Sequence, residues 1–300
     1  MLLKDYISES VSALSALYPP EEARAIVMMV CGELLGVKSY THIVEPQTEV
    51  PASRMQALEE AKSRLMSSEP VQYVLGHAVF HDLDFHVTPA VLIPRPETEE
   101  ITLAAIRTAG RIRRMREAYG KSASPVRVLD LCTGSGCISW TIALNVPGCE
   151  VVAVDISEDA LEVARHQDFS RQLAERHAVA PQFVRADVLN TAEIPSWDAF
   201  DLIISNPPYV MDSQKVSMRR NVLEHEPPLA LFVPDDDPLV FYRAVAAWAC
   251  RLLAPGGQGI VEINDMLGRE TEAVFRRAGF THASLVKDYT DKDRSVIFSR

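Results

Sequence analysis

Residues 126–138 read VRVLDLCTGSGCI, and they guide the interpretation of the rest of the chain. The apolar run VRVLDL predicts a buried strand, and an apolar helix is expected after the glycines. The turn between them, Asp130-Leu-Cys-Thr-Gly134-Ser-Gly136, would let a ligand approach the backbone and the amino end of that helix. A strand, a glycine-rich turn and a helix in this order indicate an α/β sheet with a ligand site at one edge.

Strand and helix patterns alternate from Val126 onward. Helical patterns separate the first five candidate strands, which predicts a sheet with right-handed crossovers. Between the last two there is no clear helix, only the short stretch 290–294, so we expect these to form an antiparallel hairpin. The seven candidates are VRVLDL (126–131), EVVAVD (150–155), QFVRAD (182–187), DLIISN (201–206), GQGIVEIN (257–264), HASLVKDY (282–289) and SVIFSR (295–300).

The first seventy residues predict a small helical bundle. Apolar residues recur at helical spacing over residues 3–17, and Tyr18-Pro19-Pro20 ends that helix. A second helix opens at Pro20 with two acids in its first turn, and Gly36 follows its end. A third helix is expected over residues 52–66.

Residues 71–96 connect this bundle to the sheet. The segment VQYVLGHAVFHDLDFHVTP (71–89) shows alternation and a His81-Asp82 turn, which predicts a β-hairpin. The segment VLIPRPETEEI (91–101) follows as a stiff linker, and Glu97 or Thr98 is expected to cap the next helix. We therefore divide the chain into a helical domain (1–70), a hairpin with linker (71–96) and an α/β domain (97–300).

Composition narrows the possible classes of function. An apolar fraction of 47% and a charged fraction of 24% are ordinary for a soluble globular protein. A net charge of -11 does not suit a protein whose whole surface binds nucleic acid. We expect no membrane span and no secretory signal, because no long apolar run occurs and MLLKDYISES carries an early acid.

Cysteine and histidine usage argues against a metal site. The five cysteines contain no C-x-x-C pair, which indicates reduced residues in a cytoplasmic protein. His77, His81 and His86 lie close together in the sequence, but no further ligand pattern surrounds them. No metal is therefore expected.

Four predicted strands end in residues suited to binding, and in open α/β sheets ligands bind at the carboxyl ends of strands. The glycine turn follows the first strand. Asp155 ends the second, and its carboxylate can accept hydrogen bonds from both hydroxyls of a ribose. Asp187-Val188 and Asn206-Pro207-Pro208-Tyr209 end the third and fourth. The first two features fit S-adenosylmethionine and NAD equally, although Ser139 stands where a dinucleotide motif has its third glycine.

The end of the fourth strand favours methyl transfer. Pro207 offers a backbone carbonyl but no N–H, and the side-chain oxygen of Asn206 is a second acceptor nearby. Two acceptors in one plane suit a planar NH₂ group, over which Tyr209 can lie. Such a nitrogen would become more electron-rich, and it would be positioned to take the sulfonium methyl of S-adenosylmethionine.

Together these motifs resemble the release-factor glutamine methyltransferases of the HemK/PrmC type, which are class I adenosylmethionine-dependent enzymes. The resemblance covers nearly the whole chain, and N-P-P-Y combined with IPRPETE at this spacing is a strong signature. It rests on EPVQYVLGHAVFHDLDFHVTPAVLIPRPETEE (69–100), DLCTGSGCI (130–138), SNPPYV (205–210), EHEPPLALFVPDDDPLVFY (224–242) and LLAPGG (252–257).

The resemblance implies a seven-stranded Rossmann-like methyltransferase sheet, with a small N-terminal helical bundle joined to it by a β-hairpin. It implies transfer of a methyl group from S-adenosylmethionine, leaving S-adenosylhomocysteine, to the side-chain amide nitrogen (N5) of a glutamine. That glutamine would belong to the Gly-Gly-Gln motif of class-1 peptide chain release factors. The helical domain would dock the release factor, and we expect residues 211–226 to close over its substrate loop.

The resemblance also implies a role for each candidate site residue. Asp155 would hold the ribose, and Asp187 and Val188 would border the adenine. The methionine part of the cofactor would be wrapped by Cys132, Thr133, Gly134, Ser135 and Gly136. The glutamine amide would be clamped by Asn206, Pro207, Pro208 and Tyr209, of which Asn206, Pro207 and Tyr209 are the candidate catalytic residues and Asn206 also borders the cofactor.

Two positions depart from the family pattern. The family usually has glycine where Cys132 stands, so the loop is expected to be less free there. Some members have an aromatic residue where Val188 stands, so any stacking on adenine must come from another residue.

Alternatives remain open at this point. A glutamine methyltransferase of a ribosomal protein would use nearly the same chemistry. An N-P-P-Y methyltransferase of adenine or guanine amines is disfavoured by the acidic charge and the lack of a second basic domain. A dehydrogenase and a non-catalytic adaptor are less favoured still, the adaptor because Asp155, Asn206 and the loop are intact. We expect a cytoplasmic monomer with no direct contact to nucleic acid or membrane.

Overall fold

The computed structural model describes residues 1–120 and 124–300. The chain forms two compact units. The helical unit comprises Met1–His77 and Met218–Glu226, and the sheet unit comprises Ala78–Ser217 and Pro227–Arg300. The helical unit therefore extends past residue 70 and includes a second segment from much later in the chain.

The helical unit contains the three predicted helices, which are confirmed as α1 (Leu3–Leu14), α2 (Pro20–Leu35) and α4 (Ala52–Met66). A short α3 (Thr41–Val44) lies between α2 and α4. Proline opens α2 because its missing N–H has no partner to lose in the first turn, and Gly36 ends the helix with a φ of +67°. The apolar faces meet in one core that includes Leu3, Tyr6, Leu14, Leu58 and Leu65.

Residues 71–75 differ from prediction. They form the short helix α5 (Val71–Leu75) and do not begin the hairpin. Pro70 precedes this helix and Gly76 ends it with a φ of +81°. Val71 and Tyr73 are buried. The flanking Pro70 and Gly76, together with this burial, therefore outweigh the β-propensity of VQYVL.

The second segment of the helical unit carries α10 (Arg220–His225). Arg219 Nη1 lies 2.6 Å from Glu22 Oε1, and His225 Nε2 lies 3.1 Å from the carbonyl oxygen of Ser67. Residues 211–226, which we expected to act as one loop, thus divide after Ser217 between the two units.

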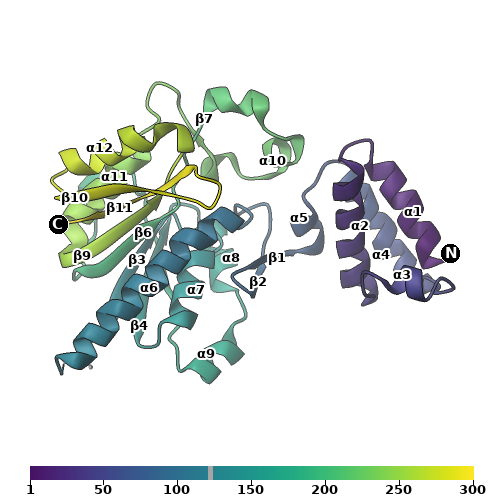
Figure 1. The fold of residues 1–300 in the computed structure, drawn as a ribbon, viewed down its shortest axis with the longest axis horizontal. Helices are drawn as coiled ribbons and strands as arrows, with labels where there is room; N and C mark the ends of the chain where they lie inside the picture. Colours follow the sequence, from purple (N-terminus) through teal and green to yellow (C-terminus); the bar gives the residue numbers. More distant parts are fainter. Residues whose placement is uncertain (121–123) are drawn as a thin grey trace. The chain divides into compact units, whose positions relative to one another are not determined.

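The sheet unit is built on seven strands in the order β10-β11-β9-β6-β3-β4-β5 (Figure 1). Only β11 runs antiparallel to its neighbours within this sheet, where the remaining pairs are parallel. The seven predicted strands and the terminal hairpin are confirmed. Their bounds are β3 (Val126–Leu131), β4 (Cys149–Asp155), β5 (Gln182–Arg185), β6 (Phe200–Ser205), β9 (Leu253–Glu262), β10 (His282–Lys287) and β11 (Asp293–Ser299).

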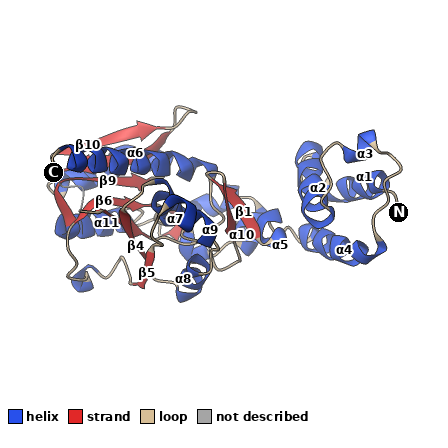
Figure 2. Cartoon of the chain, turned by 90° about the horizontal axis from the view of Figure 1, so that it is seen from below, coloured by secondary structure: helices blue, strands red, loops and turns tan. Residues whose placement is uncertain are grey.

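Helices cover both faces of this sheet (Figures 1 and 2). On one face, α6 (Pro96–Ala118) packs against β3, β6 and β9, and α7 (Cys137–Asn145) packs against β4. On the other face, α11 (Val240–Leu252) packs against β6 and β9, and α12 (Gly268–Arg277) packs against β10 and β11. This two-sided cover explains why most residues of the central strands are apolar.

The connections between strands follow the prediction with one exception. After β4 the chain forms α8 (Glu158–Arg165) and α9 (Ser170–Arg176). Between β5 and β6, however, it forms only a 3₁₀ turn, η1 (Thr191–Glu193), so the α-helix expected there is wrong. Pro195 follows this turn closely and would interrupt a longer helix.

The predicted hairpin is confirmed as β1 (His77–Phe80) and β2 (Leu83–His86). His81 and Asp82 make the turn with φ values of +50° and +59°. The predicted cap of α6 is wrong. The helix begins at Pro96 with Arg95 as N-cap and no side-chain cap, so Glu97 and Thr98 lie inside its first turn.

A second small pairing joins β7 (Val210–Met211) to β8 (Phe232–Val233). Between these two strands the chain forms η2 (Asp212–Ser217), α10 and η3 (Pro228–Ala230). Among the described residues, no helix is both long enough and apolar enough to cross a membrane.

Two glycine substitutions should change stability in opposite directions. Gly259 in β9 faces Phe298, and a Cβ there would lie 2.0 Å from the ring. Gly259→Ala should therefore destabilise the sheet unit by about 1–3 kcal/mol through overpacking. Gly110 in α6 has 3.5 Å of clearance, so Gly110→Ala should stabilise it by about 0.5–1 kcal/mol. Thermal unfolding of both variants and the parent gives the comparison, and equal shifts of the same sign would contradict it.

Candidate functional site

A cavity of about 1080 Å³, counted out to its open mouth, lies at the carboxyl edge of the sheet. It exists there because β3 pairs with β4 on one side and with β6 on the other, so the chain order reverses at β3. Nine of the predicted site residues line it: Cys132, Thr133, Gly134, Ser135, Asp155, Asp187, Val188, Asn206 and Pro208. Gly136, Pro207 and Tyr209 are not among its lining residues.

The glycine-rich loop has left-handed backbone at Cys132, Gly134 and Gly136, with φ values of +63°, +55° and +77°. For a non-glycine residue such as Cys132, this conformation costs roughly 1–2 kcal/mol. Gly136 acts in packing, because a Cβ there would lie 3.1 Å from Trp140 Cδ1 and 3.2 Å from Ala164 Cβ. Cys132 thus occupies a position where glycine would be less strained. Burial also raises the pKa of the Cys132 thiol.

Asp130, near the end of β3, holds this loop through hydrogen bonds. It was not among the predicted site residues. It is fully buried, and its Oδ2 accepts hydrogen bonds from Thr133 Oγ1 and Ser139 Oγ, both at 2.6 Å. Its other oxygen, Oδ1, has no hydrogen-bond partner. Burial raises the pKa of Asp130 to about 7. An acid inside an apolar strand next to a glycine loop was the sequence signal for this role.

Asp155 reaches the same loop from the end of β4. Its Oδ2 accepts from the backbone N–H of Gly134 at 2.8 Å, and its Oδ1 accepts from the N–H of Ser157 at 3.0 Å. Each carboxylate oxygen keeps a further lone pair. Burial raises the pKa of Asp155, and the bonds from Ser157 and Gly134 partly offset that effect. The carboxylate is therefore held in place with acceptor capacity left for a ligand.

Two exposed apolar side chains beside these acids were missed from the sequence. Ile156 follows Asp155 and Leu189 follows Val188, and both line the cavity while being 40% and 42% exposed. Phe241 of α11 lines it as well. Val188 itself is buried in the core, and its carbonyl accepts a hydrogen bond from Trp248 Nε1 at 3.0 Å. Ile156, Leu189 and Phe241 therefore add apolar surface to the cavity beside Val188.

Asp187 and the N-P-P-Y tetrad complete the described site. Asp187 is exposed, and its Oδ1 accepts from the N–H of Leu189 at 2.8 Å. Asn206 is half-buried, and its Nδ2 donates to Thr98 Oγ1 at 3.1 Å. The hydroxyl of Tyr209 donates to Glu262 Oε1 at 3.0 Å, so the position of Tyr209 over a bound amide stays a prediction.

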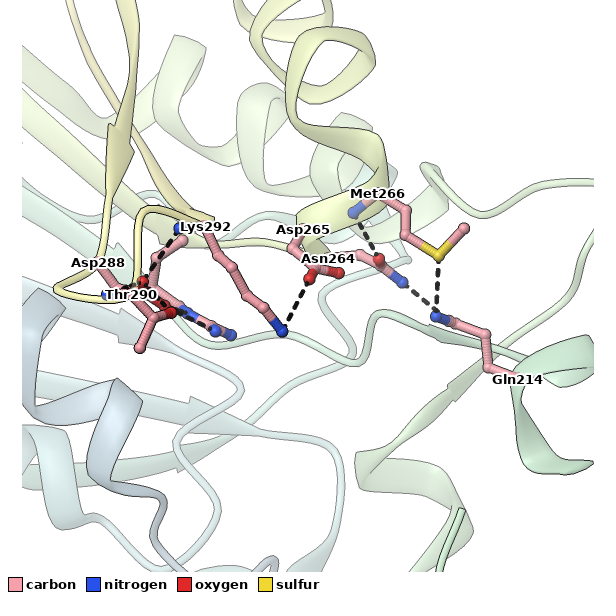
Figure 3. Close-up of polar contacts among 8 residues, drawn as sticks. Gln214, Asn264, Asp265, Met266, Asp288, Thr290 and Lys292 are labelled. Carbon is pink, nitrogen blue, oxygen red and sulfur yellow. Dashed lines mark hydrogen bonds and ion pairs between the residues drawn. The ribbon is translucent and has the colours of Figure 1, made fainter. Parts of the chain in front are cut away.

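The segment after the tetrad is held by Asn264, as Figure 3 shows. Asn264 Nδ2 donates to the carbonyl of Tyr209 and to Gln214 Oε1, both at 2.9 Å. Its Oδ1 accepts from the N–H of Met266 at 3.0 Å, and Gln214 Oε1 also accepts from the N–H of Met211 at 2.8 Å. This buried amide therefore fixes the chain where it leaves the strand end.

No metal centre is found in the part of the chain that the structure describes. There, no group of three or more His, Cys, Asp or Glu side chains is arranged to hold a metal ion. The hydrogen-bonding groups around the cavity are instead suited to an organic ligand with hydroxyl and amine donors.

Replacing Asp130 should change how stability depends on pH. Its pKa is higher in the folded protein than its ordinary value of 3.8, so its stabilising effect is complete below about pH 4 and is lost as pH rises through 7. Asp130→Asn cannot titrate. Between about pH 5 and pH 8, the melting temperature of the variant should fall less than that of the parent, as measured by calorimetry. The exposed Asp236→Asn should follow the parent, and parallel curves for parent and Asp130→Asn would refute the assignment.

A comparison of folds and family models places the chain among methyltransferases. A structure of the hMettl16 catalytic domain in complex with MAT2A 3'UTR hairpin 6 has a TM-score of 0.51, at 12% sequence identity and covering 81% of each chain. This likeness concerns the fold alone. The family model described as Methyltransferase small domain matches residues 118–227, and the one described as PrmC N-terminal domain matches residues 5–76.

Curated relatives match over nearly the full length. The release factor glutamine methyltransferase of Bacteroides thetaiotaomicron is 38% identical over 297 residues, which is 98% of this chain and 98% of the relative. The protein of the same name from Flavobacterium psychrophilum is 34% identical over 99% of this chain and 98% of its own length. The chain belongs to the release factor glutamine methyltransferase family.

Proposed function

We propose that this protein transfers the methyl group of S-adenosylmethionine to the side-chain amide nitrogen (N5) of a glutamine in a release factor. The glutamine would be that of the Gly-Gly-Gln motif of class-1 peptide chain release factors. The observation that carries the proposal is Asn206, which lines one cavity together with Asp155 and the glycine-rich loop. The names of the relatives support the substrate.

The cavity residues fit S-adenosylmethionine, which when bound supplies an electrophilic methyl group on a sulfonium sulfur. Asp155 keeps two lone pairs for ribose hydroxyls after binding Gly134 and Ser157. Ile156 and Leu189 offer apolar surface for the adenine. A Cβ added at Gly134 would meet no atom within 4 Å, so the loop leaves open space there for the methionine part of the cofactor.

Asn206 and Pro207 would act on the glutamine amide. The side-chain oxygen of Asn206 and the carbonyl of Pro207 are acceptors for the two hydrogens of a planar NH₂ group. Accepting from both hydrogens raises electron density on the nitrogen and aligns it for in-line attack. Asn206 is neutral, so it positions the nitrogen and stabilises its developing charge without acting as a strong base. As the new N–C bond forms, S-adenosylhomocysteine would be the leaving product, and the methylated nitrogen would then shed one proton to solvent. No covalent enzyme intermediate is needed.

The helical unit would dock the release factor. A protein substrate needs contact surface beyond one glutamine, and this unit has its own core, separate from the sheet. We place the enzyme in the cytoplasm, acting as a monomer. An enzyme for a ribosomal-protein glutamine would use the same site, whereas the net charge of -11 disfavours one that grips nucleic acid.

Mass spectrometry tests this function directly. A class-1 release factor is incubated with the enzyme and S-adenosylmethionine, and the peptide with Gly-Gly-Gln is sequenced by fragmentation. The proposal requires one added methyl group on that glutamine. Methylation of ribosomal proteins with none on the release factor would favour the ribosomal alternative, and methylation of RNA or DNA would overturn both.

Asp155→Ala should weaken cofactor binding. The change removes two hydrogen bonds to a charged acceptor, which is worth roughly 2–4 kcal/mol. Calorimetric titration with S-adenosylhomocysteine measures the loss. Asp159→Ala, an exposed acid on α8, is the matched control and should bind like the parent. Equal affinities in the parent and in Asp155→Ala would rule out the ribose assignment.

Asn206→Ala should slow methyl transfer while leaving the fold intact. Loss of one preorganised polar group in an active site lowers rates by about 10²–10³-fold. Single-turnover methylation of a release factor measures this, with melting temperature as a folding control. Asn190→Ala, on the exposed turn before η1, should keep the parent rate. If Asn206→Ala transfers methyl groups as fast as the parent, the tetrad is only a strand-ending turn.

A further inference from the structure

A buried carboxylate touches the N-P-P-Y tetrad at one end and, through a threonine, at the other. Glu262, the last residue of β9, is 1% exposed. Its Oε1 accepts from the hydroxyl of Tyr209 at 3.0 Å, and its Oε2 accepts from Thr98 Oγ1 at 2.8 Å. Thr98 in turn accepts from Asn206 Nδ2 at 3.1 Å. None of the roles assigned above uses Glu262 or Thr98.

Glu262 is buried and accepts hydrogen bonds from two hydroxyls. Burial raises its pKa, and the hydrogen bonds from Thr98 and Tyr209 and the nearby charge of Arg294 offset that rise only in part. Both hydroxyls donate to this side chain in the structure, Thr98 Oγ1 to Oε2 and the Tyr209 hydroxyl to Oε1. The direction of each hydrogen bond around Glu262 is therefore determined.

The direction of the hydrogen bond from Thr98 to Glu262 determines which atom of Asn206 can face Thr98. A hydroxyl carries one proton, and Thr98 gives its proton to Glu262. Only lone pairs of Thr98 Oγ1 remain for Asn206, so the Asn206 atom that faces them must be the NH₂ group. The side-chain oxygen of Asn206 is consequently the atom left for a ligand.

We propose that Thr98 and Glu262 are positioning residues that keep the side-chain oxygen of Asn206, and not its NH₂ group, turned toward the substrate amide. A flipped Asn206 would set two N–H donors against the two N–H donors of the glutamine side chain, and the acceptor for the reacting nitrogen would be lost. The relay Glu262–Thr98–Asn206 thus selects for substrates that present an NH₂ group. This inference rests on the proposed function of the site.

Thr98→Val tests the relay with little change of shape. It removes the hydroxyl, so Glu262 no longer sets the orientation of Asn206. We expect the single-turnover methylation rate to fall about 10–100-fold, with unchanged affinity for S-adenosylhomocysteine. Thr98→Ser restores the hydroxyl and should recover the rate to within about threefold of the parent.

Thr102→Val is the matched control on the same helix. Thr102 is also fully buried, and its hydroxyl donates to the backbone carbonyl of Thr98 at 2.9 Å. The substitution deletes a buried hydroxyl one turn away without touching the Asn206 side chain. Its methylation rate should match that of the parent, whereas a merely structural role of Thr98 would give both valine variants the same loss.

A double-mutant cycle with Asn206→Ala separates positioning from direct action. If Thr98 acts only through Asn206, Thr98→Val should cost nothing further when Asn206 is already alanine. An additive loss would overturn the relay. So would a parent-like rate in Thr98→Val, or a serine variant as slow as the valine variant.

The orientation of Asn206 can also be read without turnover. In ¹H–¹⁵N spectra, the side-chain NH₂ of Asn206 should exchange slowly with water in the parent and in Thr98→Ser, and quickly in Thr98→Val. Identical exchange in all three proteins would refute the relay. A parent enzyme that shows the expected exchange pattern but methylates no glutamine would instead refute the proposed function alone.

Discussion

The parallel pairing of β3 with both β4 and β6 is the constraint on which the site depends. It sets the carboxyl ends of three strands side by side, although the loop, Asp155 and Asn206 are far apart in the chain. Helices on both faces bury these strands, so their register cannot shift without exposing apolar side chains. The cavity forms at the one edge where the connections leave in opposite directions.

Two buried carboxylates support this edge, and each is bound by two hydroxyls. Asp130 holds the glycine-rich loop through Thr133 and Ser139, and Glu262 holds the tetrad through Thr98 and Tyr209. Burying an acid is unfavourable unless hydrogen bonds compensate for its lost hydration. An apolar side chain of similar size would carry no such desolvation penalty. One carboxylate thus fixes the glycine-rich loop and the other fixes the N-P-P-Y tetrad at the edge that forms the cavity.

The two departures from the family pattern, Cys132 and Val188, are accommodated by the local structure. Cys132 keeps the left-handed backbone that a glycine would adopt more easily, and the loop still bonds to Asp155 through Gly134. Val188 packs in the core while still lining the cavity, and Ile156, Leu189 and Phe241 add apolar surface beside it. The helical unit, completed by Met218–Glu226, has its own core and carries the match to the PrmC N-terminal domain.

Local sequence was enough for the strands, the glycine-rich loop, the three main helices and nine of the residues that line the cavity, because apolar periodicity, proline and glycine act over a few neighbouring residues. It failed at α5, where burial and the flanking Pro70 and Gly76 outweighed β-propensity, and at η1, where Pro195 would interrupt a longer helix. Asp130 left a local signal, but Thr98 and Glu262 did not. These two are 164 positions apart, and only the fold brings the first turn of α6 against the end of β9. The proposed orientation of Asn206 depends on this contact between α6 and β9. The direction of a hydrogen bond is set by the groups that the fold brings together, and not by neighbouring residues in the chain.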